Sequence, residues 1–240
     1  MNGPYDEESI EGLSSSLKER GRIMKGQELW RSVFSTENRF MQACEKIFDL
    51  VMVNLLFLLS CLPIFTIGIA KLSMQETVMR LRTERRVSVL KCYVQSFKKQ
   101  TRLGLQMGLL ELVVYSISVL NLLLFTQEVG LAFQVIKVVS VGLLLFFTLI
   151  FLAAYPLQVR HPMSMMAGLQ FSLVLVSLNL VWFLMLMALL WAAFSLAALS
   201  SLSLVLLLFF LLLGGFSLLS WLQEFVLDKC EKKYPILFEK

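Results

Sequence analysis

One short pattern in this sequence combines small residues and an acidic side chain within an apolar segment. Gly104, Gly108, Glu111, Tyr115 and Ser118 are spaced by four, three, four and three residues. At 100° per residue these positions share one stripe of a helix, about 80° wide. Glycines let a second helix approach closely, and a carboxylate in a membrane costs roughly 2.5–3.5 kcal/mol unless it faces protein or water. The stripe therefore predicts a structural packing face or a polar contact for a substrate or partner helix.

Glu111 needs a partner in such a position. Lys137 also lies inside an apolar segment, but at a rise of 1.5 Å per residue the two side chains differ in depth by roughly 15 Å. Lys137 is therefore expected to extend its long side chain to the outer headgroups. Glu111 must find hydrogen-bond donors elsewhere or stay protonated.

Polar residues and helix breakers interrupt the first apolar segment. Asp49 lies at its start, and Asn54 is five residues further on, which is about 140° around a helix. The two side chains therefore cannot form one ligand face. Asp49 predicts either an interfacial charge or an orienting contact with a neighbouring helix or a partner. Pro63 and Gly68 predict a kink or the end of the helix.

No catalytic or cofactor motif accompanies these residues. The sequence contains no GxxxxGKS, GxxxxGKT, HExxH or GxSxG pattern. Its one histidine, His161, has no neighbouring cysteine or carboxylate cluster to complete a metal site. The four cysteines form no CxxC pair and are expected to be free thiols. We therefore predict a protein that is not an enzyme and binds no metal or cofactor.

The composition indicates a membrane environment. Hydrophobic residues make up 58% of the chain and charged residues 16%, whereas about 25% of residues are charged in an ordinary soluble domain. No Asp, Glu, Lys or Arg occurs between His161 and Gln223, a stretch long enough for two helices of about 20 residues and a turn. The net charge of +5 then indicates contact with anionic headgroups rather than with nucleic acid. We predict an all-α, polytopic membrane helix bundle.

The apolar segments predict about five transmembrane helices between hydrophilic ends. Residues 1–37 are expected to form a polar extension and the start of an interfacial helix, residues 38–225 the bundle, and residues 226–240 a cytoplasmic tail. The spans are predicted at 48–70, 103–125, 133–155, 171–193 and 202–222.

A basic segment, residues 71–102, separates the first two predicted spans. Within it Val87, Leu90, Val94 and Phe97 are spaced like one face of a helix, which predicts an amphipathic surface helix. This helix binds either anionic headgroups, at about 1 kcal/mol per basic residue, or a cytoplasmic or membrane partner. The basic residues expected to make the contact are Arg80, Arg82, Arg85, Arg86, Lys91, Lys98, Lys99 and Arg102.

The same basic residues predict the orientation of the chain in the plasma membrane. No other loop has as many lysines and arginines, so residues 71–102 are expected to be cytoplasmic, and alternate crossings then make the C-terminus cytoplasmic too. A full crossing by the first segment, the interpretation we favour, places the N-terminus outside. The alternative is a broken or re-entrant first helix with both ends cytoplasmic.

Part of the chain resembles a known family. The stretch NRFMQACEKIFDLVMVNLLFLLSCLPIFTIG, followed by a basic segment ending in YVQSFKKQTRLG, is similar to the YesL-type membrane proteins of Gram-positive bacteria, whose function is unknown. Members of that family tend to be encoded beside carbohydrate ABC importers. The resemblance implies an accessory role in oligosaccharide uptake.

These features predict a non-enzymatic membrane accessory or scaffold protein, with ABC permease subunits or a second copy of itself as partner. One alternative is a small-solute transporter or channel that acts as an oligomer, with Glu111 and Asn54 lining the route. Another alternative is a membrane-embedded sensor of envelope stress or of glycans.

Overall fold

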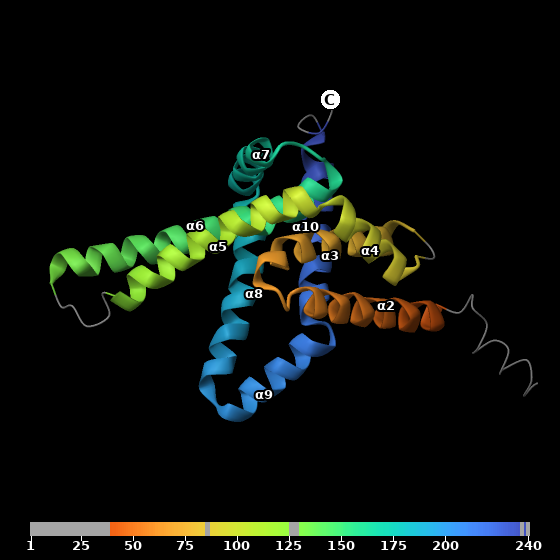
Figure 1. Cartoon of the computed structure of the whole chain (residues 1–240), viewed down its shortest axis with the longest axis horizontal. Helices are drawn as coiled ribbons and strands as arrows, with labels where there is room; N and C mark the ends of the chain where they lie inside the picture. Colours follow the sequence, from red (N-terminus) through yellow and green to blue (C-terminus); the bar gives the residue numbers. More distant parts are fainter. Residues whose placement is uncertain (1–38, 85–86, 125–129, 236–237, 239–240) are drawn as a thin grey trace, which may run out of the picture. The chain divides into compact units, whose positions relative to one another are not determined.

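The described part of the chain is helical throughout (Figure 1). This computed structural model describes residues 39–84, 87–124, 130–235 and 238, and no strand occurs among them. The all-α class predicted from the sequence is confirmed. The elements are α2 (Arg39–Ser60), the 3₁₀ helix η1 (Ile64–Thr66), α3 (Ile67–Thr83), α4 (Val89–Lys99), α5 (Thr101–Leu124), α6 (Leu131–Arg160), α7 (Met165–Leu178), α8 (Leu180–Leu199), α9 (Ser201–Phe210), the π-helical turn η2 (Leu211–Gly215) and α10 (Phe216–Lys233).

The chain divides into two units at Phe48. Of the first unit only the beginning of α2 is described, and the predicted polar extension 1–37 lies outside the described residues. The second unit, Asp49–Lys240, contains the remaining helices. Every contact discussed below lies within this second unit.

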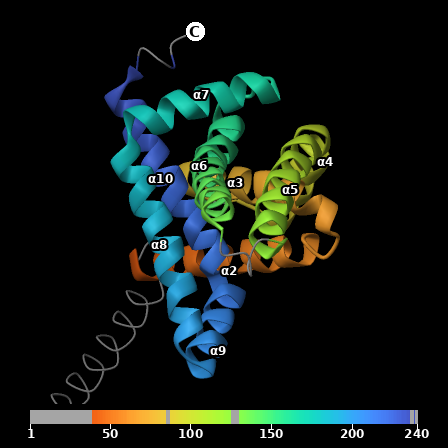
Figure 2. The same cartoon turned by 90° about the vertical axis from the view of Figure 1, so that its left-hand side faces the viewer.

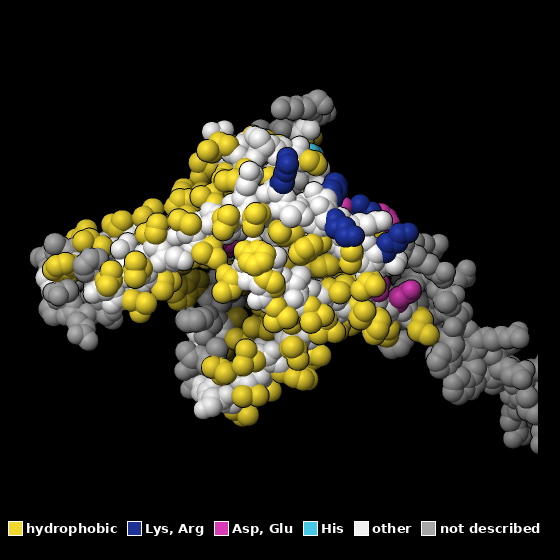
Figure 3. Space-filling model, in the orientation of Figure 1, with side chains coloured by type: hydrophobic (Ala, Val, Ile, Leu, Met, Phe, Trp, Pro, Cys, Tyr) yellow, Lys and Arg dark blue, Asp and Glu magenta, His cyan; other side chains and the backbone are white. Residues whose placement is uncertain are grey.

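Within the described ranges, three helices are long and apolar enough to cross a membrane. They are α5, the part of α6 from Phe133 to Arg160, and the run of α9, η2 and α10 from Ser201 to Lys233. Each overlaps a span predicted from the sequence. Figure 3 shows hydrophobic side chains spread over α5 and α6, as expected for helices that face lipid. These helices are consistent with a membrane protein.

α7 and α8 form a bent pair in place of the continuous fourth span predicted at 171–193. The two helices differ in direction by 97°, and they add a fourth candidate crossing only if the pair is one broken span. The break lies at Asn179, whose backbone is not helical, with φ −125° and ψ 35°. Figure 2 shows α7 lying across the end of α6, with α8 running away from it. A single Asn scarcely changes the hydropathy of the segment, so the bend was not predicted.

The first apolar segment, predicted as a span at 48–70, is also broken. α2 ends at Ser60 and α3 begins at Ile67. Pro63 lies between them in an extended conformation, with φ −78° and ψ 120°, and it lacks the N–H that a continuing helix needs. Gly68, the second predicted weak point, instead lies inside α3. The segment therefore consists of two helices joined by a turn.

The first part of the predicted basic loop belongs to the core. Residues 71–83 form the greater part of α3, which packs against α4, α5, α6 and α10. Residues 72–78 of this helix are all buried. Arg85 and Arg86 lie outside the described residues. The number of lysines and arginines in this segment predicts a surface loop and does not reveal that α3 is central. The apolar and small polar residues of α3 are distributed around all its faces, so they form no apolar stripe.

α4 is amphipathic, but its buried face differs from the predicted stripe. Val89, Cys92 and Tyr93 are buried where α4 packs on α3, whereas Leu90 and Val94 of the predicted stripe are exposed. Apolar residues cover a wide arc of this helix, and contact with α3 uses only one side of the arc. The other side remains available for lipid or a partner.

α10 continues past the predicted end of the last span at residue 222. It ends at Lys233, about three turns later. Val226, Leu227 and Cys230 are buried in one cluster with apolar residues of α6, α7 and α8. Residues 226–233, predicted as part of a cytoplasmic tail, therefore continue the helix, and one side of it packs into the core.

Candidate functional site

Three glycines bring α3 and α5 into backbone contact. A Cβ atom on Gly68 would lie 2.2 Å from the carbonyl oxygen of Gly104 and 2.5 Å from the Cα of Gly108. A Cβ atom on Gly104 would lie 2.6 Å from the Cα of Ile69. No side chain fits at such separations, because interiors are already close-packed. The structure thus places a second helix against Gly104 and Gly108, and that helix is α3 of the same chain.

Lys71 and Glu111 form an ion pair one turn away from this contact. Nζ of Lys71 lies 2.5 Å from Oε1 of Glu111, and the hydroxyl of Tyr155 donates to Oε2 at 2.6 Å. The carboxylate is buried, whereas the lysine is partly exposed and its Nζ lies 5.1 Å from the centre of the Tyr155 ring. The donors that Glu111 needs are therefore supplied by α3 and α6.

The sequence pattern alone assigns Lys71 to the basic segment and misses this role. A signal was nevertheless present, because a carboxylate buried in an apolar segment requires a counter-charge. Which lysine or arginine supplies that charge becomes apparent only when the partner helix is known.

The remaining stripe residues also bond within the chain. The hydroxyl of Tyr115 lies 3.2 Å from Oγ1 of Thr148 on α6, and its ring meets that of Phe151 edge to face. Ser118 is buried, and its hydroxyl donates to the carbonyl of Val114 in its own helix. From Gly104 to Tyr115 the stripe therefore contacts α3 and α6 of the same chain.

A cavity of about 210 Å³ lies beside the ion pair, where α2, α3, α5, α6, α8 and α10 meet. Three phenylalanine rings, Phe57, Phe151 and Phe216, form part of its wall. Its polar lining includes Lys71, Gln75, Glu111, Tyr155, Ser220 and Gln223.

Gln75 joins α3 to α10 at the wall of this cavity. Its amide oxygen accepts a hydrogen bond from the hydroxyl of Ser220 at 2.7 Å, and its amide nitrogen donates to Oε1 of Gln223. All three side chains are buried. Their mutual bonds fix the direction in which each amide points, so the cavity presents an ordered set of donors and acceptors.

Asn54 stabilises the break between α9 and α10. Its side-chain amide donates to the carbonyls of Leu211 and Leu212, at 2.8 Å each, and its oxygen accepts from the backbone N–H of Ser217 at 3.2 Å. These groups border the π-helical turn η2. Backbone groups freed by a break in an apolar helix need such partners, because lipid offers none. Asn54 therefore caps another helix; it does not belong to the cavity lining.

The other first-helix positions lie apart from Asn54. Asp49 is half-exposed on the same helix, while Asn54 is fully buried, so the two do not share a ligand face. Pro63 is exposed in the turn before α3.

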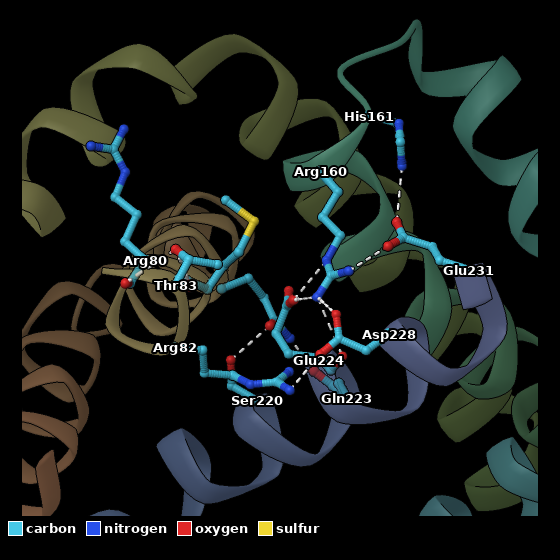
Figure 4. Close-up of polar contacts among 12 residues, drawn as sticks. Arg80, Arg82, Thr83, Arg160, His161, Ser220, Gln223, Glu224, Asp228 and Glu231 are labelled. Atoms are coloured by element: carbon cyan, nitrogen blue, oxygen red, sulfur yellow. Dashed lines mark hydrogen bonds and ion pairs between the residues drawn. The ribbon is translucent and has the colours of Figure 1, made fainter. Parts of the chain in front are cut away.

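A cluster of charged side chains lies at the ends of α6 and α10 (Figure 4). Arg160 donates to Oε2 of Glu224 through Nε at 2.9 Å and Nη2 at 2.7 Å, and to Glu231 through Nη1 at 2.6 Å. Nη2 also lies 2.5 Å from Asp228. Glu224 has no exposed surface, so the guanidinium of Arg160 supplies the charge that such a carboxylate requires.

The charge cluster also includes residues from α3 and from the turn after α6. Arg82 pairs with Asp228, and Nε2 of His161 lies 3.0 Å from Glu231. The sequence gives no reason to place Arg160 or His161 beside these acidic residues. The spacing of the acidic residues at 224, 228 and 231 indicates one helical face, but it does not reveal the arginine that they hold.

Of the basic residues predicted to bind headgroups or a partner, some are paired with acidic side chains and some are exposed, and Lys99 is both. Arg80 lies 2.8 Å from Glu76, and Lys99 lies 3.8 Å from it. Burial alone would raise the pKa of Glu76, but hydrogen bonds from Gln100 and Arg80 and the charge of Lys99 outweigh it and hold that pKa below its usual 4.5. Arg82 belongs to the charge cluster. The exposed members are Lys91, Lys98, Lys99 and Arg102.

Among the residues that the structure describes, no three His, Cys, Asp or Glu side chains are grouped to hold a metal ion. The chemistry that the cavity offers is hydrogen bonding and charge compensation.

The helices that build the glycine contact and the ion pair also contain the part of the chain that is similar to known proteins. Residues 50–122 match the family DUF624. This family, described as "Protein of unknown function", includes the YesL-type proteins, so the resemblance is supported over that part of the chain. The match contains Lys71 and Glu111, but not Tyr155 or the acidic residues of the charge cluster. No curated protein and no solved structure matches the chain.

Proposed function

We propose that this is a multi-pass plasma-membrane protein that binds a small polar solute beside Lys71 and Glu111 and catalyses no reaction. The cavity carries this proposal, because it combines a buried ion pair, ordered amides and aromatic rings among apolar helices. Pockets of mixed apolar and convergent polar lining are typical of ligand sites. Charged groups inside an apolar bundle are costly, and they typically serve a ligand pathway or a partner helix.

We assign the end of the bundle that carries α4 and the charge cluster to the cytoplasm. Exposed Lys91, Lys98 and Arg102 lie at this end, and Figure 3 shows lysine and arginine side chains gathered over α4. Lysine and arginine favour the cytoplasmic side. In this arrangement α5, α6, α8 and the α9–α10 run cross the membrane, one crossing fewer than the predicted five, and the C-terminus is cytoplasmic.

The charge balance of the cavity favours a neutral ligand. Lys71 and Glu111 compensate each other's charge. The amides of Gln75 and Gln223 and the hydroxyls of Tyr155 and Ser220 are groups that both donate and accept hydrogen bonds. A small solute rich in hydroxyl groups, such as a carbohydrate, suits this set. The association of the resembled family with oligosaccharide uptake points the same way.

Thermal unfolding of the full-length protein in detergent or nanodiscs tests this proposal. Neutral mono- and disaccharides, polyols and zwitterionic amino acids would be added separately, because a ligand at 100 times its Kd stabilises the folded state by about 2.7 kcal/mol. We expect a sugar or polyol to raise the unfolding midpoint. Glu111→Gln should weaken that binding by about tenfold or more, since hydrogen bonds to a charged group contribute about 1.5–3 kcal/mol. Lys98→Met, on the exposed side of α4, is the control that should bind normally.

Two results would overturn the cavity as a ligand site. One is that none of these solutes shifts the midpoint of the wild-type protein. The other is that a solute stabilises wild type and Glu111→Gln at the same concentrations, which would place its site elsewhere. If a solute does bind, its uptake into sealed vesicles distinguishes a transporter from a sensor.

A second candidate function is that of an accessory protein of a carbohydrate ABC importer. The outward side of α4 favours it, because exposed Leu90 and Val94 lie on the same short helix as exposed Lys91 and Lys98. Mixed apolar and basic surfaces of this kind suit a membrane partner, such as a permease subunit or a second copy of the chain, as well as anionic headgroups. Solute binding and an accessory role are compatible.

A further inference from the structure

The turn between α2 and α3 presents large apolar side chains to its surroundings. Leu62, Ile64 and Phe65 are exposed by 79%, 67% and 60%. A turn that faces water is normally built from Gly, Asn, Asp and Ser. Three large exposed apolar side chains within one turn instead indicate contact with an apolar medium.

This turn also satisfies most of its own backbone. The N–H of Cys61 bonds the carbonyl of Phe57 at 3.0 Å, and Pro63 has no N–H to satisfy. Thr66 contributes further: its N–H donates to the carbonyl of Pro63 at 3.0 Å, and its hydroxyl bonds the carbonyls of Ser60 and Pro63 at 2.5 and 2.6 Å. Non-helical backbone is not found in contact with lipid at the centre of the hydrocarbon layer, because unsatisfied polar groups are costly there. With most of its polar groups bonded, this turn suits the acyl chains near the headgroups, at partial depth.

The chain reverses direction at the turn. At its start, α3 touches Gly108 through Gly68, and Gly108 is roughly 10 Å along α5 from its first residue, at 1.5 Å per residue. Toward its other end, Glu76 accepts a hydrogen bond from Gln100, just before α5 begins. Arg82 then reaches Asp228 in the charge cluster. α3 therefore runs from inside the bundle back to its polar end.

The second half of α2 accompanies α3 along this path. Val53 and Phe57 belong to one buried cluster with Ala70, Met74 and Val78 of α3. Two helices joined by a six-residue connection that share such a cluster form a helical hairpin.

From these observations we infer that residues 49–83 form a re-entrant hairpin, whose tip at residues 61–66 contacts lipid acyl chains and does not cross the membrane. The hairpin enters from the face on which α4 lies. This re-entrant course replaces the full crossing favoured by the sequence, and Asp49 at the start of the hairpin, α4 and the end of α10 all lie on one side. This inference does not depend on what the cavity binds.

Native cysteines allow a direct test of sidedness. Cys44 is exposed on α2, while Cys92 and Cys230 are buried, so in a Cys61→Ala protein a membrane-impermeant maleimide reports mainly on Cys44. Two reference proteins, each also lacking Cys44 and Cys61, carry Ser88→Cys between α3 and α4 or Ser201→Cys at the start of α9. Both reference serines are exposed.

We expect Cys44 and Ser88→Cys to react from the same side of the membrane, in intact cells and in inverted vesicles, and Ser201→Cys to react from the opposite side. Labelling of Cys44 from the side of Ser201→Cys would overturn the hairpin. The reference at position 88 shows whether each preparation is sealed and oriented.

The position of the tip is tested separately with a spin label on Cys61 in a protein whose Cys44 is replaced by Ala. We expect the label to relax faster with dissolved oxygen than with a water-soluble nickel complex, as it does among acyl chains. The reverse order would place the tip in water and overturn insertion, even if Cys44 and position 88 share one side. A label at Ser88→Cys is the water-exposed control.

Discussion

Glu111 and Glu224 show how this chain keeps carboxylates buried among apolar helices. Each is paired with one basic residue from another helix, Glu111 with Lys71 and Glu224 with Arg160. A buried charge without a counter-charge costs several kcal/mol, whereas a pair with good hydrogen bonds largely offsets that cost. The two members of each pair are therefore expected to depend on each other.

Replacing Arg160 by Met tests this dependence. The change leaves Glu224, which is fully buried, without the guanidinium that holds it. We expect the free energy of unfolding, measured by denaturant titration in mild detergent, to fall by roughly 3–5 kcal/mol. Arg160→Lys should recover only part of the loss, because an ammonium lacks the planar fork that serves several carboxylates. Arg102→Met removes an exposed arginine and should change stability by about 0.5 kcal/mol or less. Equal effects of Arg160→Met and Arg102→Met would contradict the pairing argument.

At the scale of elements, the separation between α3 and α5 determines the site. Gly68, Gly104 and Gly108 let the two backbones touch, and only at that separation does Lys71 reach Glu111. The bend at Asn179 and the π-helical turn capped by Asn54 similarly set the courses of α8 and α10. Each of these features depends on one or two residues within a long apolar segment.

Gly68→Ala should therefore disrupt the bundle more than the same change elsewhere. Its Cβ would lie 2.2 Å from a backbone oxygen of α5, so the helices must separate, and we expect a loss of about 1–3 kcal/mol in unfolding free energy. Gly142→Ala is the matched control, because its Cβ would meet nothing within 4 Å. In a helix this control change should be neutral or stabilising by up to about 1 kcal/mol. Similar losses for both variants would show that the glycine contact is not required.

At the scale of the whole molecule, the described residues present two kinds of exposed surface. Apolar side chains cover much of α5 and α6 (Figure 3) and suit lipid. The outward side of α4, with Leu90, Val94, Lys91 and Lys98, mixes apolar and basic groups. That side is where an accessory function would have its partner.

Extraction in a mild detergent and purification of the tagged protein test the accessory role. We expect permease subunits of an ABC importer, or a second copy of the chain, to be recovered with the wild type. Lys98→Glu should reduce the recovered partner severalfold, because a rim charge contributes to docking. Lys232→Glu makes the same charge change at an exposed position near the end of α10 and should have no effect. Recovery of a partner-free monomer from wild-type cells would overturn this role.

The sequence by itself determined the helical class, the apolar character and most helix positions. These follow from local properties: the length of uncharged runs, and the spacing of residues around a helix. For the same reason the stripe containing Gly104, Gly108 and Glu111 could be recognised as a contact face before its partner was known.

The tertiary structure decided which residues meet. Lys71 belongs to the basic segment in the sequence and Arg160 follows an apolar segment, and both prove to be counter-charges of buried carboxylates. The break at η2 depends on a distant residue that satisfies the freed backbone, since Asn54 bonds the carbonyls of Leu211 and Leu212. Burial and pairing are properties of two surfaces in contact, and hydropathy along one chain segment contains no information about the second surface.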